Sequence, residues 1–323
     1  MRTLLFAALL ALPGLAAAQD QDSLVTYNGA CDGSAAATLD PHHFVAANDD
    51  DNSLRLYRIG VSNPLAVVDL DPTLMPERKK DGRLKEVDIE GAARIGRRIY
   101  WIASHGRDKD GNKERSRCRF FATDIGKATG SIPFALSPTT AYSGLLQELI
   151  EQLPELDLGD ASKLAPEKKR GFNIEGLAAA PDGSLLIGLR NPRPGGKAIV
   201  IPFTNPADVL DRGARARFGT PERLALDDRG IRSIERIGDR YVIVAGPFAD
   251  KGTFALYTWS GPGGRNPRLE GGSALHDLKP EALIATADPR GVYLLSDDGT
   301  DACKALTDRN GKTFRGLAVR LAD

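Results

Sequence analysis

The clearest pattern along the chain is a repeated pair of short apolar segments separated by a turn. An acidic and then a small residue open the first segment, and polar residues end the second, stronger one. The plainest copies cover residues 90–105, 175–191 and 281–298. Gly, Asp and Pro mark most of the turns, as in Pro181-Asp182-Gly183, which is the composition that tight turns need. Each copy therefore predicts a β-hairpin.

Two weaker copies complete the set. One begins at Asp32 and runs to residue 49, and the other, over residues 232–246, carries Arg232 in place of the acid. An alternating strand follows each hairpin, and often a further one, which makes about four strands per unit. The first residues of successive copies are 58, 85, 57 and 49 positions apart. Four-stranded units that recur every 40 to 50 residues or so are typical of a β-propeller.

We therefore predict an all-β fold, a β-propeller of five four-stranded blades with one helical insertion near residues 137–171. Within that interval, apolar residues recur at helical spacing: Leu145, Leu146, Leu149, Ile150 and Leu153. The interval is also long enough to hold a degenerate blade. Six blades are thus the alternative.

Residues 1–18 have the layout of a secretory signal peptide. Arg2 precedes an apolar run over residues 4–15, and three alanines at 16–18 precede Gln19. We expect cleavage after Ala18, which leaves residues 19–323 as a single propeller domain. No later stretch reaches the roughly 18 apolar residues that a transmembrane helix requires. The expected location is the periplasm or the exterior of the cell.

The amino-acid composition argues against some classes of binding partner. The chain has 43 Lys and Arg and 43 Asp and Glu, a formal net charge of zero. That balance argues against nucleic acid as a partner and against capture by an anionic membrane, because both need a surplus of cations. Export would permit one disulfide among Cys31, Cys118 and Cys303, although the sequence does not choose the pair, and three reduced cysteines are the alternative. Nothing in the sequence indicates the oligomeric state.

Propeller topology predicts where the repeated polar residues lie. The first strand of a blade lines the channel and the second runs back beside it, so the start of the first and the end of the second share one rim. The starts of first strands are Asp32, Glu90, Glu175, Arg232 and Glu281. The ends of second strands are Asn48, Asp49, Ser104, His105, Arg190, Asn191, Asp297 and Asp298. We expect them all around one mouth of the channel, with the helical insertion on the same side as a partial lid.

Three of these positions suggest a metal site. Glu90, Glu175 and Glu281 would repel one another at the axis unless a cation, Arg232 or a shared proton compensates. Oxygen ligands without a nearby His pair suit Ca²⁺ or Mg²⁺ better than Zn²⁺. The alternative is architectural: each acid accepts backbone N–H groups at the channel entrance.

Other candidates carry weaker signals. His105 ends a strand close to Arg107 and could transfer protons near neutral pH, although a solvated surface histidine fits the same pattern. The run Asp49-Asp50-Asp51-Asn52 has the composition of a calcium loop without the spacing, which favours an ordinary turn. There is no serine-hydrolase elbow, phosphate-binding loop, zinc spacing or sign of an organic cofactor.

At this point a family resemblance becomes visible. The segment Asp88-Ile89-Glu90-Gly91-Ala92 with residues 100–106, and residues 172–177 with residues 186–192, resemble the bacterial domain-of-unknown-function family numbered thirty-six sixteen. The likeness runs over most of residues 25–320 and implies a propeller without an established activity. The Glu-Gly-Leu-Ala step is also similar to phytase-like esterase propellers and, more loosely, to lactonase propellers that hold a central metal. These are likenesses of fold, which does not determine function.

Two function classes follow. The first is a metal-assisted hydrolase of a phosphate ester, ester or lactone, in which Glu90, Glu175 and Glu281 hold Ca²⁺ or Mg²⁺. Its predicted catalytic residues are His105, Arg190 and Arg232. Its predicted ligand-binding residues are Arg107, Asn191, Asn48, Asp49 and Asp297. The second class is a non-catalytic propeller that binds a small polar ligand, a sugar or an envelope protein at the same rim.

Overall fold

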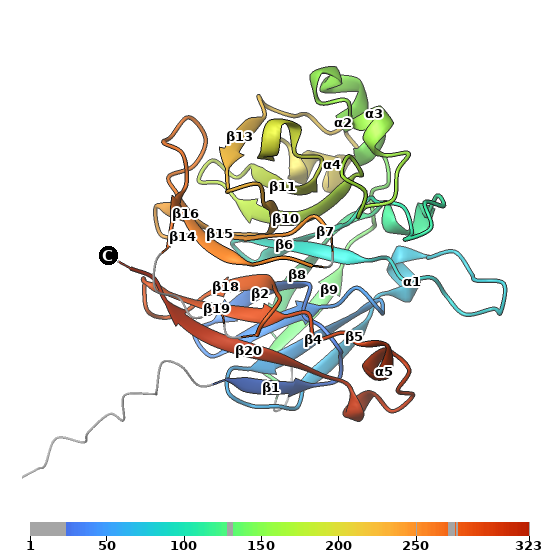
Figure 1. Cartoon of the computed structure of the whole chain (residues 1–323). Coiled ribbons are helices and arrows are strands. Elements are labelled where there is room, and N and C mark those ends of the chain that lie inside the picture. The colour runs from blue at the N-terminus through green and yellow to red at the C-terminus, as the bar shows by residue number, and fades with distance from the viewer. Residues whose placement is uncertain (1–23, 128–131, 250, 271–274, 276, 323) are drawn as a thin grey trace, which may run out of the picture.

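Five four-stranded antiparallel sheets form a ring in the computed structural model of the chain (Figure 1). The structure describes residues 24–322 except 128–131, 250, 271–274 and 276, so the predicted signal peptide lies outside the described residues. The all-β propeller and its five blades are confirmed. Within the described part of the chain, the long spacing between the second and third repeats holds helices and no sixth blade.

Each blade runs from an inner strand at the channel to an outer strand at the surface. Blade 1 contains β2 (Ala35–Asp40), β3 (His43–Ala47), β4 (Ser53–Arg58) and β5 (Ala66–Asp69). Blade 2 contains β6 (Ile89–Ile95), β7 (Arg98–Ala103), β8 (Phe120–Lys127) and β9 (Phe134–Pro138). Blade 3 contains β10 (Asn173–Ala179), β11 (Leu185–Asn191), β12 (Lys197–Phe203) and β13 (Glu222–Ala225). Blade 4 contains β14 (Gly230–Ile237), β15 (Arg240–Gly246), β16 (Ala255–Trp259) and β17 (Arg268–Leu269).

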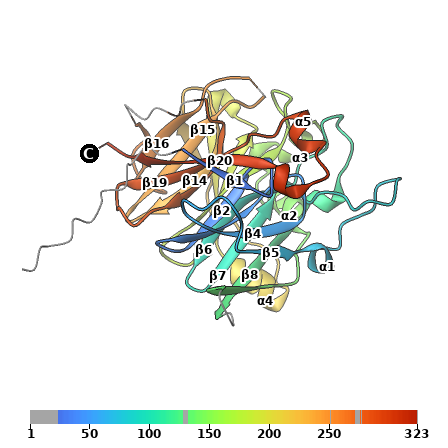
Figure 2. The same ribbon diagram turned by 90° about the horizontal axis from the view of Figure 1, so that it is seen from below.

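Blade 5 joins the two ends of the chain. It contains β18 (Pro280–Ala285), β19 (Gly291–Ser296) and β20 (Thr313–Arg320), and β1 (Val25–Asn28) is its outer strand. β1 lies antiparallel beside β20 in both views, with Val25 opposite Gly316 (Figure 1, Figure 2). A disulfide between Cys31 and Cys303 ties the same region, and Cys118 is free. The pair that the sequence left open is therefore Cys31–Cys303, and the ring is closed by strand pairing and by a covalent bond.

Close packing of the inner strands explains the small residue after the acid in the repeat. A Cβ on Gly91 would lie 2.9 Å from Ile102 Cγ2 and 3.0 Å from Leu177 Cβ. A Cβ on Gly176 would lie 2.9 Å from side-chain carbons of two isoleucines of blade 4. Because interiors are packed this tightly, a larger residue at either position would push neighbouring blades apart.

The helical insertion lies between blades 2 and 3. It contains α2 (Leu145–Gln152), a 3₁₀ turn and α3 (Leu158–Ala161) (Figure 1). The leucines of its apolar face pack into the core shared by those blades. It starts later than residue 137 because residues 134–138 form β9. The other helices are α1 (Asp71–Leu74), α4 (Pro206–Arg212) and α5 (Asp301–Lys304). None of the helices in the described residues is long and apolar enough to cross a membrane.

Candidate functional site

The acid position of the repeat coincides with an irregularity in the inner hairpin of four blades. The pairing of inner and second strand shifts register at Glu90, Glu175, Arg232 and Glu281. Such bulges interrupt the alternation of a strand and redirect one side chain. All four side chains are buried, and they meet at the mouth of the channel.

Blade 1 departs from this arrangement. Asp32 was predicted to open its inner strand, but β2 begins three residues later, at Ala35. The register shift of this hairpin lies at its far end, near Asp40. Asp32 instead forms an isolated β-bridge with Asp297 of blade 5. The chain approaches β2 from the outer strand of blade 5, so Asp32 belongs to the closure of the ring.

Arg232 lies at the centre of a group that includes Glu90, Glu175 and Glu281, which we call the glutamate cluster. Its Nε lies 2.9 Å from Glu175 Oε2, and its Nη2 forms an ion pair with Glu281 Oε1. Glu175 Oε1 also accepts hydrogen bonds from Arg190 Nη1 at 2.9 Å and from Asn173 Nδ2 at 2.7 Å. Of the three ways in which the sequence allowed the glutamates to be compensated, the structure therefore shows arginine.

Glu90 differs from the other two glutamates. Its side chain is buried and has no hydrogen bond or ion pair with any residue that the structure describes. Burial raises the pKa of Glu90 well above its ordinary value, and the nearby charges of Glu175 and Asp88 add to the effect. Glu90 is therefore a carboxyl group that keeps its proton to an unusually high pH.

The close group of carboxylates is not the one predicted from the sequence. Within the described residues, the three carboxylates with oxygens less than 4.8 Å apart are Asp32, Asp49 and Asp50, which we call the aspartate cluster. Glu90, Glu175 and Glu281 do not form such a group. Their role as metal ligands stays a prediction that these distances do not favour.

Each member of the aspartate cluster has an oxygen without a hydrogen-bond partner among the described residues. Asp32 is 1% exposed, and its Oδ1 accepts the N–H of Asp49 at 3.1 Å. Asp32 Oδ2, Asp49 Oδ1 and Asp50 Oδ2 are buried without a hydrogen-bond partner among the described residues. Lys304 supplies one positive charge, with its Nζ 2.9 Å from Asp50 Oδ1 and 3.8 Å from Asp49 Oδ1. One ammonium group faces three carboxylates.

The carboxylates of the aspartate cluster repel one another, and this repulsion contributes to the raised pKa values of Asp32 and Asp49. Burial raises the pKa of Asp32 well above its ordinary value, and the charges of Asp49 and Asp50 raise it further. Burial also raises the pKa of Asp49 to about 7, against the attraction of Lys304. The cluster is therefore short of positive charge.

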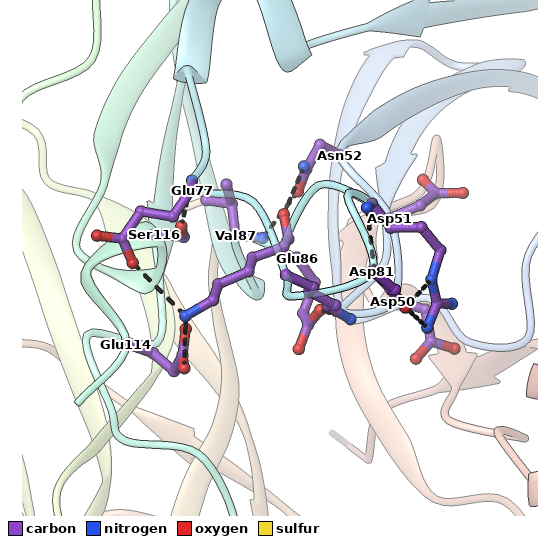
Figure 3. A network of polar contacts seen from close by, with 12 residues as sticks. Asp50, Asp51, Asn52, Glu77, Asp81, Glu86, Val87, Glu114 and Ser116 are labelled. Atoms are coloured by element: carbon purple, nitrogen blue, oxygen red, sulfur yellow. Dashed lines mark hydrogen bonds and ion pairs between the residues drawn. The ribbon is translucent and has the colours of Figure 1, made fainter. Parts of the chain in front are cut away.

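The loop that carries Asp49 and Asp50 is held by its own side chains. Asn48 Oδ1 accepts the N–H groups of Asp50 and Asp51 at 2.9 and 2.8 Å, and Arg55 Nη2 lies 2.6 Å from Asp51 Oδ2. Asn52 Oδ1 accepts the N–H of Val87 at 2.7 Å, which ties this loop to the start of blade 2 (Figure 3). Asn48, predicted to bind ligand, is thus used to order the loop.

His105 and Arg107 also differ from their predicted surroundings. His105 is 2% exposed, and its Nδ1 lies 2.7 Å from the carbonyl of Ala103, which fixes the proton on Nδ1. Burial lowers the pKa of His105 to about 4, so the ring is neutral at pH 7. Arg107 donates from Nε to Ser162 O at 2.8 Å and from Nη1 to Gly111 O at 2.9 Å. The first contact anchors the helical insertion. The catalytic role of His105 and the ligand-binding role of Arg107 stay predictions.

Asn191 and Asp297 also make structural contacts. Asn191 Nδ2 donates to Pro166 O at 3.0 Å and to Lys168 O at 2.8 Å, which holds the insertion at the mouth, where topology predicts it. Asp297 Oδ1 accepts the N–H of Gly299 at 2.8 Å. Their ligand-binding roles stay predictions.

The glutamate and aspartate clusters are parts of one electrostatic site. The charge of Asp49 acts on Glu90, and that of Asp297 acts on Arg232. Arg117, whose Nη1 is 3.0 Å from Asp88 Oδ2, feels the charges of both Glu90 and Asp49. Sequence reasoning missed Asp50 and Lys304 as site residues. The acidic run at 49–51 was the signal for Asp50. Lys304 follows Cys303, whose disulfide partner Cys31 lies next to Asp32, and no sequence pattern indicated that pairing.

Comparison with known proteins leaves the activity open. Residues 144–273 match the family model described as "Protein of unknown function (DUF3616)", which confirms the resemblance drawn from the sequence over that part of the chain. A solved glutaminyl cyclase from Myxococcus xanthus aligns with a TM-score of 0.46 at 12% identity, over 94% of this chain and 97% of that chain. A PQQ-bound aldose sugar dehydrogenase from Streptomyces coelicolor aligns with a TM-score of 0.45 at 12% identity, over 93% and 98%. No curated protein matches the chain.

Proposed function

We propose that the protein binds a divalent cation, Ca²⁺ or Mg²⁺, through the aspartate cluster and hydrolyses a small anionic ester or a lactone beside it. One observation carries the proposal: three neighbouring carboxylates each keep a buried oxygen without a hydrogen bond. A buried oxygen of this kind is costly unless a partner satisfies it. A cation satisfies all three together.

The donor set fits a hard cation. All three side chains offer carboxylate oxygens, and the cluster contains no imidazole or thiolate. Asp49 and Asp50 are partly exposed, so water can complete the coordination shell. Lys304 leaves the cluster with an excess of negative charge, which the cation neutralises.

Residues next to the cluster supply the remaining chemistry. A bound cation polarises the ester oxygen and makes a nearby water more acidic. Glu90, which retains its proton because its pKa is raised, donates that proton to the oxygen that leaves as the ester bond breaks. Arg117 Nε and Arg190 Nε are buried without hydrogen-bond partners among the described residues, so both can donate to an anionic substrate.

Binding without reaction is the second candidate. Arg190 and Arg232 are already paired with Glu175 and Glu281, which leaves little positive charge for an anionic substrate at the channel axis. That observation favours a neutral polar ligand, such as a sugar, held by the same groups.

Hydrolysis assays separate the two candidates. Purified protein would be incubated with p-nitrophenyl phosphate, p-nitrophenyl acetate and a δ-lactone, with Ca²⁺ or Mg²⁺ and with EDTA. Hydrolysis should require the cation and disappear in Asp32→Asn. It should persist in Asp239→Asn, which changes an exposed turn between β14 and β15. Cation binding without hydrolysis of any of the three would support the second candidate.

Glu90→Gln tests the proton donor separately. The amide has the same shape and cannot supply the proton, so turnover should fall at least about 100-fold while the cation still binds. Unchanged turnover would remove Glu90 from the mechanism.

We also propose that the protein acts in the periplasm or outside the cell. The Cys31–Cys303 disulfide supports this location, because such bonds persist in oxidising compartments. Cell fractionation of the native host with antibody detection would test it, and recovery in the cytoplasm would contradict it.

A further inference from the structure

A cavity lies between the helical insertion and blade 3. Its volume is about 710 Å³, in the range of small-molecule sites. The insertion contributes residues 156–170 on one side, and the loop after β11 with Asp228 forms the other side. We call this cavity the insertion cleft.

The basic residues of the insertion cleft outnumber its acids. The basic ones are Lys163, Lys169, Arg170 and Arg193, and the acids are Asp157, Asp160 and Asp228. Lys163 Nζ is 2.8 Å from Asp160 Oδ1, and Arg193 Nη1 is 2.9 Å from Asp228 Oδ1. Outside these two ion pairs, the charged residues that line the cleft are the cations Lys169 and Arg170 and the acid Asp157.

Lys169 and Arg170 line the cleft without forming a hydrogen bond or an ion pair in the described part of the chain. Both are exposed. The preceding segment is fixed, because Asn191 Nδ2 holds the carbonyls of Pro166 and Lys168. The two cations are therefore carried on an anchored segment.

Arg193 supplies a buried donor to the same cleft. Its side chain is 3% exposed, and its guanidinium lies 4.6 Å from the centroid of the Phe248 ring. Its Nε is buried without a hydrogen-bond partner among the described residues. Next to it, Gly195 has a φ of 64°, and a Cβ there would contact nothing within 4 Å, so the backbone lies open to a ligand.

We propose that the insertion cleft binds a phosphate-bearing small molecule. Arg193 Nε offers a buried donor that has no hydrogen-bond partner among the described residues. Lys169 and Arg170 offer positive charge that is not taken up in an ion pair, although the charge of Arg170 also acts on Asp160. The volume accommodates a sugar phosphate or a nucleotide as well as the phosphate group. This site is independent of the aspartate cluster and of the hydrolase proposal.

Isothermal titration calorimetry on the full mature chain tests the inference, with glucose 6-phosphate, glucose and citrate as probes. We expect binding of glucose 6-phosphate that weakens with added salt, and none of glucose. The double substitution Lys169→Gln with Arg170→Gln should weaken binding at least tenfold. Both positions are exposed, so the fold should persist, and circular dichroism would check this.

The matched control is Lys80→Gln with Lys127→Gln, which removes two exposed cations away from the cleft. It should bind within twofold of the unaltered protein, and so should Asp32→Asn in the presence of EDTA. Absence of binding, equal loss in the control, or equally tight binding of glucose or citrate would each overturn the proposal. If Asp32→Asn loses cation binding and keeps sugar-phosphate binding, the two sites are independent of each other.

Discussion

Arg232 Nε, on the inner strand of blade 4, lies 2.9 Å from Glu175 Oε2 on the inner strand of blade 3. The same guanidinium pairs with Glu281 of blade 5. Blade 4 has a base where blades 2, 3 and 5 have an acid, and this base pairs with two of the three glutamates. Both partners of the pair are almost fully buried, so their attraction is only weakly screened by solvent.

Removing this arginine should strongly destabilise the fold. In Arg232→Leu, Glu175 and Glu281 would face each other in a buried site, and breaking such a pair costs about 3–5 kcal/mol. Urea unfolding followed by circular dichroism would measure the loss. Arg217→Leu is the control, because Arg217 is 69% exposed and 3.7 Å from Asp208, where an ion pair contributes about 0–1 kcal/mol. Equal losses in the two variants would contradict a central role for Arg232.

The glycine after the acid should be just as sensitive. Gly176→Ala forces a methyl group to within 2.9 Å of blade 4, so we expect a loss of about 1–3 kcal/mol in urea unfolding. Gly126→Ala is the matched control, because the nearest atoms there are 3.6 Å away. A Gly176→Ala variant as stable as the control would mean that the blades can separate without penalty.

The disulfide should be a major contributor to stability. Cys31 and Cys303 are 272 residues apart, and in the chain-entropy model closing so long a loop stabilises the fold by about 5 kcal/mol. Changing both cysteines to alanine should lower the melting temperature by at least 10 °C, and a reducing agent should do the same to the unaltered protein. Cys118→Ser should melt normally. If the double variant has the same melting temperature as the unaltered protein, the β1–β20 pairing is sufficient to close the ring.

His105 should make the fold sensitive to acid. Its pKa is lowered from 6.5 to about 4 in the folded state, so between those values the unfolded chain binds a proton that the folded chain does not. Stability due to this group is therefore complete above pH 6.5 and is lost as the pH falls towards 4, by about 3 kcal/mol in total.

Unfolding free energies between pH 4 and 7.5 would measure this dependence. His105→Asn should lack that part of it, since Asn tolerates the φ of 55° at this position and does not titrate. His42→Asn, at an exposed site, is the control. Parallel pH profiles for His105→Asn and the unaltered protein would contradict the assignment.

Much of the architecture could be predicted from the sequence because the blades share one pattern of polar, small and apolar residues. The acid, the small residue, the turn and the second apolar run recur around Glu90, Glu175 and Glu281, and topology predicted that the three residues lie on the same side of the ring. The helical insertion was visible because its leucines follow helical rather than strand spacing. The disulfide was not, since three cysteines give no distances.

The candidate site was predicted less well, for a definite reason. A repeat shows which residues occupy the same position in different blades. A site, in contrast, depends on contacts between residues that occupy different positions. Asp32 comes from the closure of the ring, Asp50 from a turn of blade 1 and Lys304 from a helix tied down by the disulfide. No periodicity links these three. Likewise, burial of His105 depends on neighbouring segments far away in the sequence.

The central claim is that the aspartate cluster holds a divalent cation. Titration of Ca²⁺ into metal-free protein by isothermal calorimetry, with Asp32→Asn and Asp239→Asn alongside, tests it most directly. We expect one site per chain in the unaltered protein and in Asp239→Asn, with affinity reduced at least tenfold in Asp32→Asn. Absence of binding by both Ca²⁺ and Mg²⁺, or equal affinity in Asp32→Asn, would contradict it.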